Sequence, residues 1–113
     1  MTFGFDIDGI LKGKHTYIFQ ILTDLIRKNL DNRIVIISGR SDSQIEMIKE
    51  DLKEKRIFYH YISLYPGQHR GNEDVGVFKA RRCKELLVDL FFEDNYIQAA
   101  IMRTSGITVA EVR

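Results

Sequence analysis

The sequence predicts an α/β protein built on a mostly parallel β-sheet. Short runs of β-branched and aromatic residues alternate with amphipathic stretches along all 113 residues. The run at 33–37 is apolar on both faces, which is typical of a buried parallel strand. Strands that alternate with helices favour a parallel sheet covered on both faces. We therefore expect a Rossmann-like three-layer αβα sandwich with five strands, formed by one domain that spans 1–113.

The elements follow one another in the order β-α-β-α-β-α-β-α-β. The first strand begins at Phe3 and runs into Asp6 and Asp8, and the later strands are expected at 33–37, 57–62, 88–92 and 107–112. Helices are expected at about 15–30, from Ser41 with Gln44 as a capping box, from Asn72 or Asp74, and at 96–105 with Gly106 after its end. The longest loop is predicted at 63–73. In the first helix, helical spacing defines one apolar face: Tyr17, Ile18, Ile21, Leu22, Leu25 and Ile26.

Composition narrows the function classes. The net charge of +1 gives no overall attraction to nucleic acid or membranes. The single cysteine, Cys83, cannot form an internal disulfide, which fits a reducing compartment. The sequence shows neither a signal peptide nor a long apolar run. We expect a cytoplasmic protein without a membrane partner.

Polar side chains follow three of the predicted strands. Asp6 and Asp8 follow the first, Ser38 the second, and Glu93 and Asp94 the fourth. In a parallel sheet these ends lie at one edge, where ligands bind at a switch in strand order. Neighbouring carboxylates repel unless a cation lies between them. The pattern therefore predicts a shared site for a divalent metal and phosphate.

These motifs resemble those of the haloacid dehalogenase (HAD) superfamily. The matching segments are FDIDG, IVIISGR, a lysine near the start of the third helix, and FFEDN. The resemblance implies a Mg²⁺-dependent phosphatase that acts through an aspartyl-phosphate. Asp6 would be the nucleophile, Asp8 the general acid and base, Ser38 a phosphoryl ligand, and Lys79 the neutralising cation.

The same resemblance implies a metal site. Asp6, the Asp8 backbone carbonyl and Asp94 would hold Mg²⁺. Glu93 would lie next to these ligands without binding the metal itself. Further candidate substrate contacts are Gly39 and Arg40, which follow Ser38, and His69 and Arg70 in the long loop.

The chain leaves no room for a cap domain between these motifs. An open, capless site suits bulky phosphorylated substrates such as a nucleic-acid or protein end. A sugar phosphate is the other possibility, with subunits of a homo-oligomer covering one another's sites. The phosphatase domain of polynucleotide kinases is one capless comparison, and it shares an acidic pair leading into a helix.

Two other classes remain open. A receiver domain would match the length and the acidic pocket, but its phospho-accepting Asp ends a middle strand, whereas the third strand here ends in Ile62 and Ser63. A non-catalytic phosphate-binding module would keep the same fold. Taken singly, Ser38 could be an ordinary turn serine and Lys79 a surface lysine.

Overall fold

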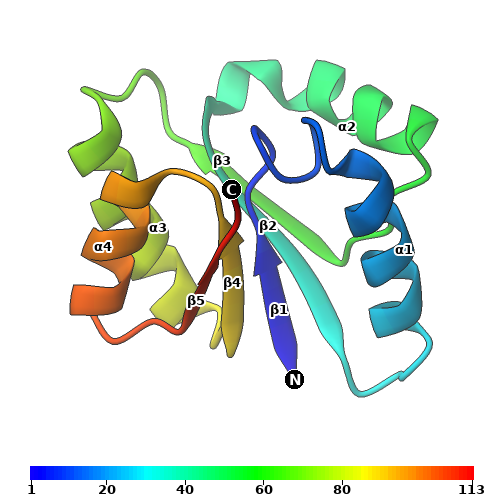
Figure 1. Ribbon diagram of the computed structural model, residues 1–113. Coiled ribbons are helices and arrows are strands. Elements are labelled where there is room, and N and C mark those ends of the chain that lie inside the picture. The colour runs from blue at the N-terminus through cyan, green and yellow to red at the C-terminus, as the bar shows by residue number, and fades with distance from the viewer.

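The computed structural model describes residues 1–113 and confirms the predicted fold class (Figure 1). The strands are β1 Thr2–Phe5, β2 Arg33–Ser41, β3 Tyr61–Tyr65, β4 Leu90–Glu93 and β5 Val109–Glu111. The helices are α1 Thr16–Arg27, α2 Ile45–Glu54, α3 Asn72–Glu85 and α4 Tyr96–Thr104, with a short 3₁₀ helix at Asp42–Gln44. All strand pairs are parallel, in the order β3-β2-β1-β4-β5. No helix is long and apolar enough to cross a membrane.

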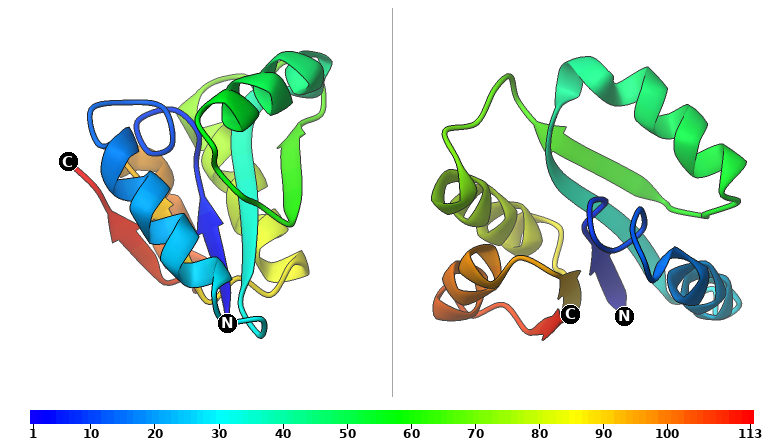
Figure 2. Two further views of the ribbon diagram at one scale, coloured as in Figure 1. Left: turned by 90° about the vertical axis from the view of Figure 1, so that its right-hand side faces the viewer. Right: turned by 45° about the horizontal axis from the view of Figure 1, so that its top comes forward.

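The sheet is covered on both faces, with α1 and α2 on one side and α3 and α4 on the other (Figures 1 and 2). Alternation along β2 explains why its sequence is continuously apolar. Ile34 and Ile36 belong to the core cluster under α1 and α2, whereas Val35 and Ile37 belong to the cluster under α3 and α4. Successive side chains of a strand point to opposite faces, so a central strand between two helical layers needs apolar residues at every position.

The order of the strands places a crevice at the end of β1. The chain moves outward from β1 to β2 and β3, then crosses back through α3 to β4 on the other side of β1. Strand order therefore reverses at β1, which is where a ligand site forms in such sheets. Asp6 directly follows β1, Ser38 lies within β2, and Glu93 ends β4.

The apolar face predicted for α1 packs on the core only in part. Tyr17, Ile18, Ile21 and Leu25 are 71%, 55%, 46% and 56% exposed. Of the predicted residues, the helix buries Ile26 and half-buries Leu22, and it also buries Phe19 and Thr23, which the prediction left out. Thr23 can serve as a core residue because its hydroxyl donates to the Phe19 carbonyl oxygen at 2.8 Å within the helix. A polar residue type therefore lies on the buried side, while larger apolar residues face solvent.

The third strand starts later than predicted. Residues 57–60 connect α2 to the sheet, and β3 runs from Tyr61 to Tyr65, so part of the predicted 63–73 loop is strand. Ile57 is buried although it lies outside the sheet, because α2 ends in a left-handed residue, Arg56 with φ 56°, that turns the chain back into the core. The free loop is therefore the shorter stretch 66–71.

Two helix ends show how local side chains set the boundaries. Ser41 accepts a hydrogen bond from the Ser43 N–H at 3.2 Å and caps the 3₁₀ turn, whereas the predicted reciprocal bond from Gln44 does not form. At the end of α4, Gly106 has φ +91°, as its predicted C′ position requires.

The buried thiol of Cys83 gives a test of this packing. Cys83 is 0% exposed, and burial raises its pKa to about 12. Because the thiolate is the reactive form, the native protein should be inert to Ellman's reagent at about pH 8, and denaturant should release one reactive thiol per chain. Rapid stoichiometric labelling without denaturant would show that α3 does not pack on the sheet as described.

Candidate functional site

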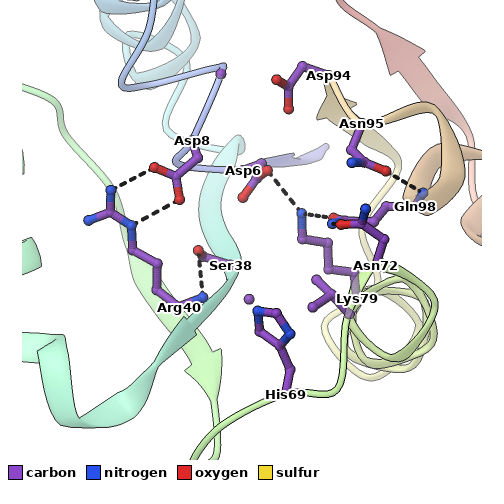
Figure 3. Close-up of a pocket in the computed structure, with 13 residues that line it drawn as sticks. Asp6, Asp8, Ser38, Arg40, His69, Asn72, Lys79, Asp94, Asn95 and Gln98 are labelled. Atoms are coloured by element: carbon purple, nitrogen blue, oxygen red, sulfur yellow. Dashed lines mark hydrogen bonds and ion pairs between the residues drawn. The ribbon is translucent and has the colours of Figure 1, made fainter.

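An open pocket of about 320 Å³ lies at the carboxyl edge of the sheet (Figure 3). Its walls come from the ends of β1, β2 and β4 and from α3, α4 and the loop before α3. Nearly all the lining residues are polar or glycine: Asp6, Asp8, Gly9, Ser38, Gly39, Arg40, His69, Asn72, Val75, Lys79, Asp94, Asn95 and Gln98. Four of the polar residues predicted at the strand ends therefore line one pocket: Asp6, Asp8, Ser38 and Asp94.

Lys79 is the central cation of this pocket. Its side chain is 1% exposed, and its Nζ lies 3.0 Å from Asp6 Oδ2, 2.5 Å from Glu93 Oε1 and 2.6 Å from Gln98 Oε1. An ammonium has three protons, so these acceptors match its donor capacity. Burial lowers the pKa of Lys79, but the charges of Asp6 and Glu93 outweigh that effect and raise it overall. Lys79 is not a surface lysine and remains charged.

Glu93 supports this cation with both carboxylate oxygens engaged. Oε1 accepts from Lys79, and Oε2 accepts the backbone N–H groups of Asp94 and Asn95 at 3.1 and 3.2 Å. The side chain is fully buried, and burial together with the nearby Asp6 charge raises its pKa. Glu93 therefore fixes both the Lys79 side chain and the turn that follows β4.

Three carboxylates gather beside Lys79. Asp6, Glu93 and Asp94 each offer an oxygen, and these oxygens lie within 4.8 Å of one another. The pKa of Asp94 is raised by burial and by the Asp6 charge, as expected where anions crowd. One ammonium leaves this set of three carboxylates with an excess of negative charge. Hard oxygen donors of this kind suit a hard divalent cation, so the cluster could hold a metal ion.

The backbone at Gly9 makes room for the Asp94 carboxylate. Gly9 has φ +80°, and a Cβ at this position would lie 1.8 Å from Asp94 Oδ2. Only glycine tolerates both that backbone angle and that approach. The glycine of the FDIDG segment therefore lets Asp94 lie against the turn after β1.

Asp8 lies apart from the acidic cluster. Its carboxylate accepts two hydrogen bonds from Arg40, Nη2 to Oδ1 at 2.6 Å and Nε to Oδ2 at 2.9 Å (Figure 3). The Asp8 side chain is 60% exposed, and its hydrogen bonds raise the pKa of Arg40. A pair this exposed contributes about 1 kcal/mol or less to stability. The predicted metal contact through the Asp8 backbone carbonyl stays a prediction.

Ser38 and Gly39 form the wall between Asp8 and α3. Ser38 is 1% exposed, and its Oγ accepts the backbone N–H of Arg40 at 3.1 Å, which leaves the hydroxyl proton free to donate. Gly39 lies against α3, because a Cβ there would come within 2.8 Å of Val75 Cγ1. Ser38 and Gly39 thus present little side-chain bulk to the pocket.

The two candidate substrate contacts in the loop before α3, His69 and Arg70, differ in where they lie. His69 lines the pocket, and its Nδ1 accepts the Gly71 N–H at 3.0 Å. Figure 3 shows the imidazole pointing from the loop toward Ser38. Arg70 is exposed and is not among the lining residues; its backbone N–H donates to Asp74 Oδ2. Of this pair, only His69 faces the site.

Sequence reasoning missed three amide side chains in the pocket. Gln98 accepts from Lys79 and donates through Nε2 to Asn72 Oδ1 at 3.0 Å, while Asn95 caps α4 by accepting the Gln98 N–H. The N-x-x-Q spacing after β4 was the available signal, because it marks a helix start whose fourth residue lies near the cap.

Comparison with known proteins shows that this chain shares its fold with solved structures. No family model matches the sequence, and no curated protein matches it. Solved structures that share the fold include a chain of the Pnkp1/Rnl/Hen1 complex, at 15% identity and TM-score 0.77, and a chain of the Pnkp1/Rnl/Hen1 RNA repair complex, at 13% identity and TM-score 0.77. They cover 98% of this chain but only 45% and 42% of their own chains, so this chain spans less than half their length.

Gly9 and Gly67 form a matched pair for testing the contact with Asp94. Both have positive φ, but a Cβ at Gly67 meets nothing within 4 Å. Gly67→Ala should cost only backbone strain, about 1–2 kcal/mol in free energy of unfolding. Gly9→Ala should cost more and should also weaken divalent-metal binding, measured by calorimetric titration with Mg²⁺ or Mn²⁺. Equal stability and equal metal affinity in the two variants would contradict the described position of Asp94.

Proposed function

We propose that this chain is a Mg²⁺-dependent phosphatase of the HAD type, which hydrolyses phosphoric monoesters through an aspartyl-phosphate on Asp6. The observation that carries the proposal is the buried Lys79 ammonium, 3.0 Å from Asp6 Oδ2 at the strand-order switch. A carboxylate attacks a phosphate poorly because like charges meet, and a fixed cation beside it removes much of that penalty. The neighbouring Glu93 and Asp94 make the same place suitable for a metal ion.

In the first step, an Asp6 carboxylate oxygen attacks phosphorus, and the bond from phosphorus to the leaving oxygen breaks. The Ser38 hydroxyl proton is the donor available to an equatorial oxygen of the phosphoryl group, and Lys79, whose three protons are engaged, contributes its positive charge beside Asp6. Mg²⁺ held by Asp6 and Asp94 would add Lewis-acid neutralisation of the transferring group. The product of this step is an acyl phosphate on Asp6 and a free alcohol.

In this mechanism Asp8 transfers the protons. Asp8 gives a proton to the leaving oxygen, then takes one from the water that attacks the acyl phosphate and restores Asp6. In the free protein the Asp8 carboxylate accepts both of its hydrogen bonds from Arg40. Arg40 lies where a substrate phosphate can compete for the guanidinium, and that exchange would free Asp8 to turn and accept a proton.

The best-supported substrate is a phosphorylated end of RNA. The pocket is open and polar, and no domain is inserted between the strands to cover it. Solved structures with the same fold include a chain of the Pnkp1/Rnl/Hen1 RNA repair complex and a chain of a Pnkp1/Rnl/Hen1 complex. A macromolecular end can reach an uncovered pocket with its terminal phosphate while the rest of the polymer stays outside. The near-neutral net charge predicts modest, salt-sensitive affinity for such a polymer.

Carboxylate-to-amide variants at Asp6 and Asp8 test the chemistry. Asp6→Asn should abolish Mg²⁺-dependent turnover of p-nitrophenyl phosphate, because the nucleophile is lost. Asp8→Asn should lower kcat about 10²–10⁴-fold and leave slow phosphoryl transfer to Asp6 intact.

Steady-state and single-turnover kinetics measure both effects. Substantial turnover by Asp6→Asn with none by Asp8→Asn would reverse the two roles. Wild-type protein that binds phosphate with Mg²⁺ but never turns over would instead support a receiver or binding module.

The loop before α3 yields a second test with an internal control. His69→Ala should raise KM for an RNA oligonucleotide with a terminal phosphate and change kcat little, because the imidazole lies at the pocket wall. Arg70→Ala, one residue away and outside the wall, should leave KM nearly unchanged. Equal effects of the two variants, or equal losses on p-nitrophenyl phosphate, would remove His69 from substrate binding.

A further inference from the structure

Two asparagine side chains line the pocket with amide N–H groups that no protein atom accepts. Asn72 is the first residue of α3, and Asn95 directly precedes α4. Each amide makes one hydrogen bond, and in both cases the oxygen is the atom engaged. We propose that these two amides bind the phosphoryl group that Asp6 attacks, on the side of the pocket formed by α3 and α4. The inference rests on the phosphatase function proposed above.

The orientation of the Asn72 amide follows from Lys79. An ammonium can only donate, so the atom of the Gln98 amide that meets Lys79 Nζ at 2.6 Å is the oxygen. The Gln98 nitrogen lies at the other end of that amide and donates to Asn72 at 3.0 Å, so the accepting atom of Asn72 is Oδ1. The Asn72 Nδ2 group, with two protons, is left without a partner in the protein.

The orientation of the Asn95 amide follows from its place before α4. A backbone N–H can only donate, and the Gln98 N–H meets the Asn95 amide at 3.0 Å, so the engaged atom is Oδ1. Figure 3 shows this bond on the side of the Asn95 amide that faces away from Asp6. The Asn95 Nδ2 group, which also has two protons, therefore lies on the pocket side.

The other polar side chains of α3 and α4 in the pocket are engaged within the protein. The three protons of Lys79 are taken by Asp6, Glu93 and Gln98. Gln98 is buried, and both ends of its amide form hydrogen bonds. Ser38 can donate a proton, but it comes from β2 and lies on the far side of Asp6 from both asparagines in Figure 3. On the side of α3 and α4, the two asparagines are therefore the free donors.

The transferring phosphoryl group needs donors on more than one side, because its charge is spread over three equatorial oxygens. In the mechanism proposed above, the Ser38 hydroxyl reaches one oxygen and a metal ion would neutralise another. The third oxygen is left for the side of α3 and α4, where Asn72 and Asn95 present their Nδ2 groups. Hydrogen bonds to a charged acceptor are the strong ones, so each amide should contribute to phosphate affinity.

Variants that replace asparagine with aspartate separate this role from a role in starting the helices. Aspartate keeps the oxygen that accepts from Gln98, and it is as good an N-cap as asparagine, but its carboxylate has no N–H to donate. Asn72→Asp and Asn95→Asp should each weaken the binding of inorganic phosphate in the presence of Mg²⁺ by about 10-fold or more, measured by ³¹P NMR titration. The thermal unfolding midpoint should not fall in either variant.

Two control variants account for the added negative charge. Asn29→Asp makes the same change in the loop between α1 and β2, at the opposite edge of the sheet, where Asn29 Oδ1 accepts the Asp31 N–H at 3.0 Å. This variant should bind phosphate as wild type does. Asn95→Gly removes the amide without adding a charge, and glycine is itself a tolerated N-cap, so this variant should also lose about 10-fold in phosphate affinity.

The outcomes distinguish this inference from the function on which it rests. Wild-type protein that neither binds phosphate nor hydrolyses p-nitrophenyl phosphate would contradict the phosphatase function as well. Wild-type binding that is unchanged in Asn72→Asp and Asn95→Asp would overturn the inference alone and leave the asparagines as helix-start residues. A loss in the aspartate variants with none in Asn95→Gly would trace the effect to the added charge and would also overturn it.

Discussion

The ammonium of Lys79 is a buried charge, and its side chain and its three contacts come from four different elements. It comes from α3 and contacts Asp6 at the end of β1, Glu93 at the end of β4 and Gln98 in α4. Taking an ion out of water costs several kcal/mol, and removing one partner of a buried pair costs about 3–5 kcal/mol. The contacts that hold these elements together are therefore also the contacts that aim Lys79 at Asp6.

The packing of α3 on α4 allows this arrangement. At Gly76, one helical turn before Lys79, a Cβ would come within 3.0 Å of Ile101 Cδ1, so the two helices approach closely at that point. Close approach brings the Gln98 amide to the Lys79 ammonium and to Asn72. The surplus of carboxylates over ammonium beside Asp6 follows from the same geometry. It makes the pocket suitable for a divalent cation.

The sequence predicted the sheet and the strand-end residues well for physical reasons. Apolar runs that end in acids or a hydroxyl place those residues at one edge of a parallel sheet, so Asp6, Ser38 and Glu93 could be grouped without coordinates. The face of α1 could not be assigned in this way, because periodicity identifies an apolar stripe but not whether the sheet or solvent lies against it. Thr23 is buried there while Ile21 is exposed. The Asp8–Arg40 pairing and the reach of Gln98 depend on side-chain positions between distant segments, which spacing does not encode.

The central claim is that Asp6, set against Lys79, carries the phosphoryl group. Acid quench of the wild-type protein during Mg²⁺-dependent turnover, followed by peptide mass spectrometry, tests it directly. The account predicts the mass increment of one phosphoryl group on the N-terminal peptide, localised to Asp6 and absent when Mg²⁺ is chelated. Sustained turnover with no phosphoryl group trapped on Asp6, or with the group found on another residue, would contradict it.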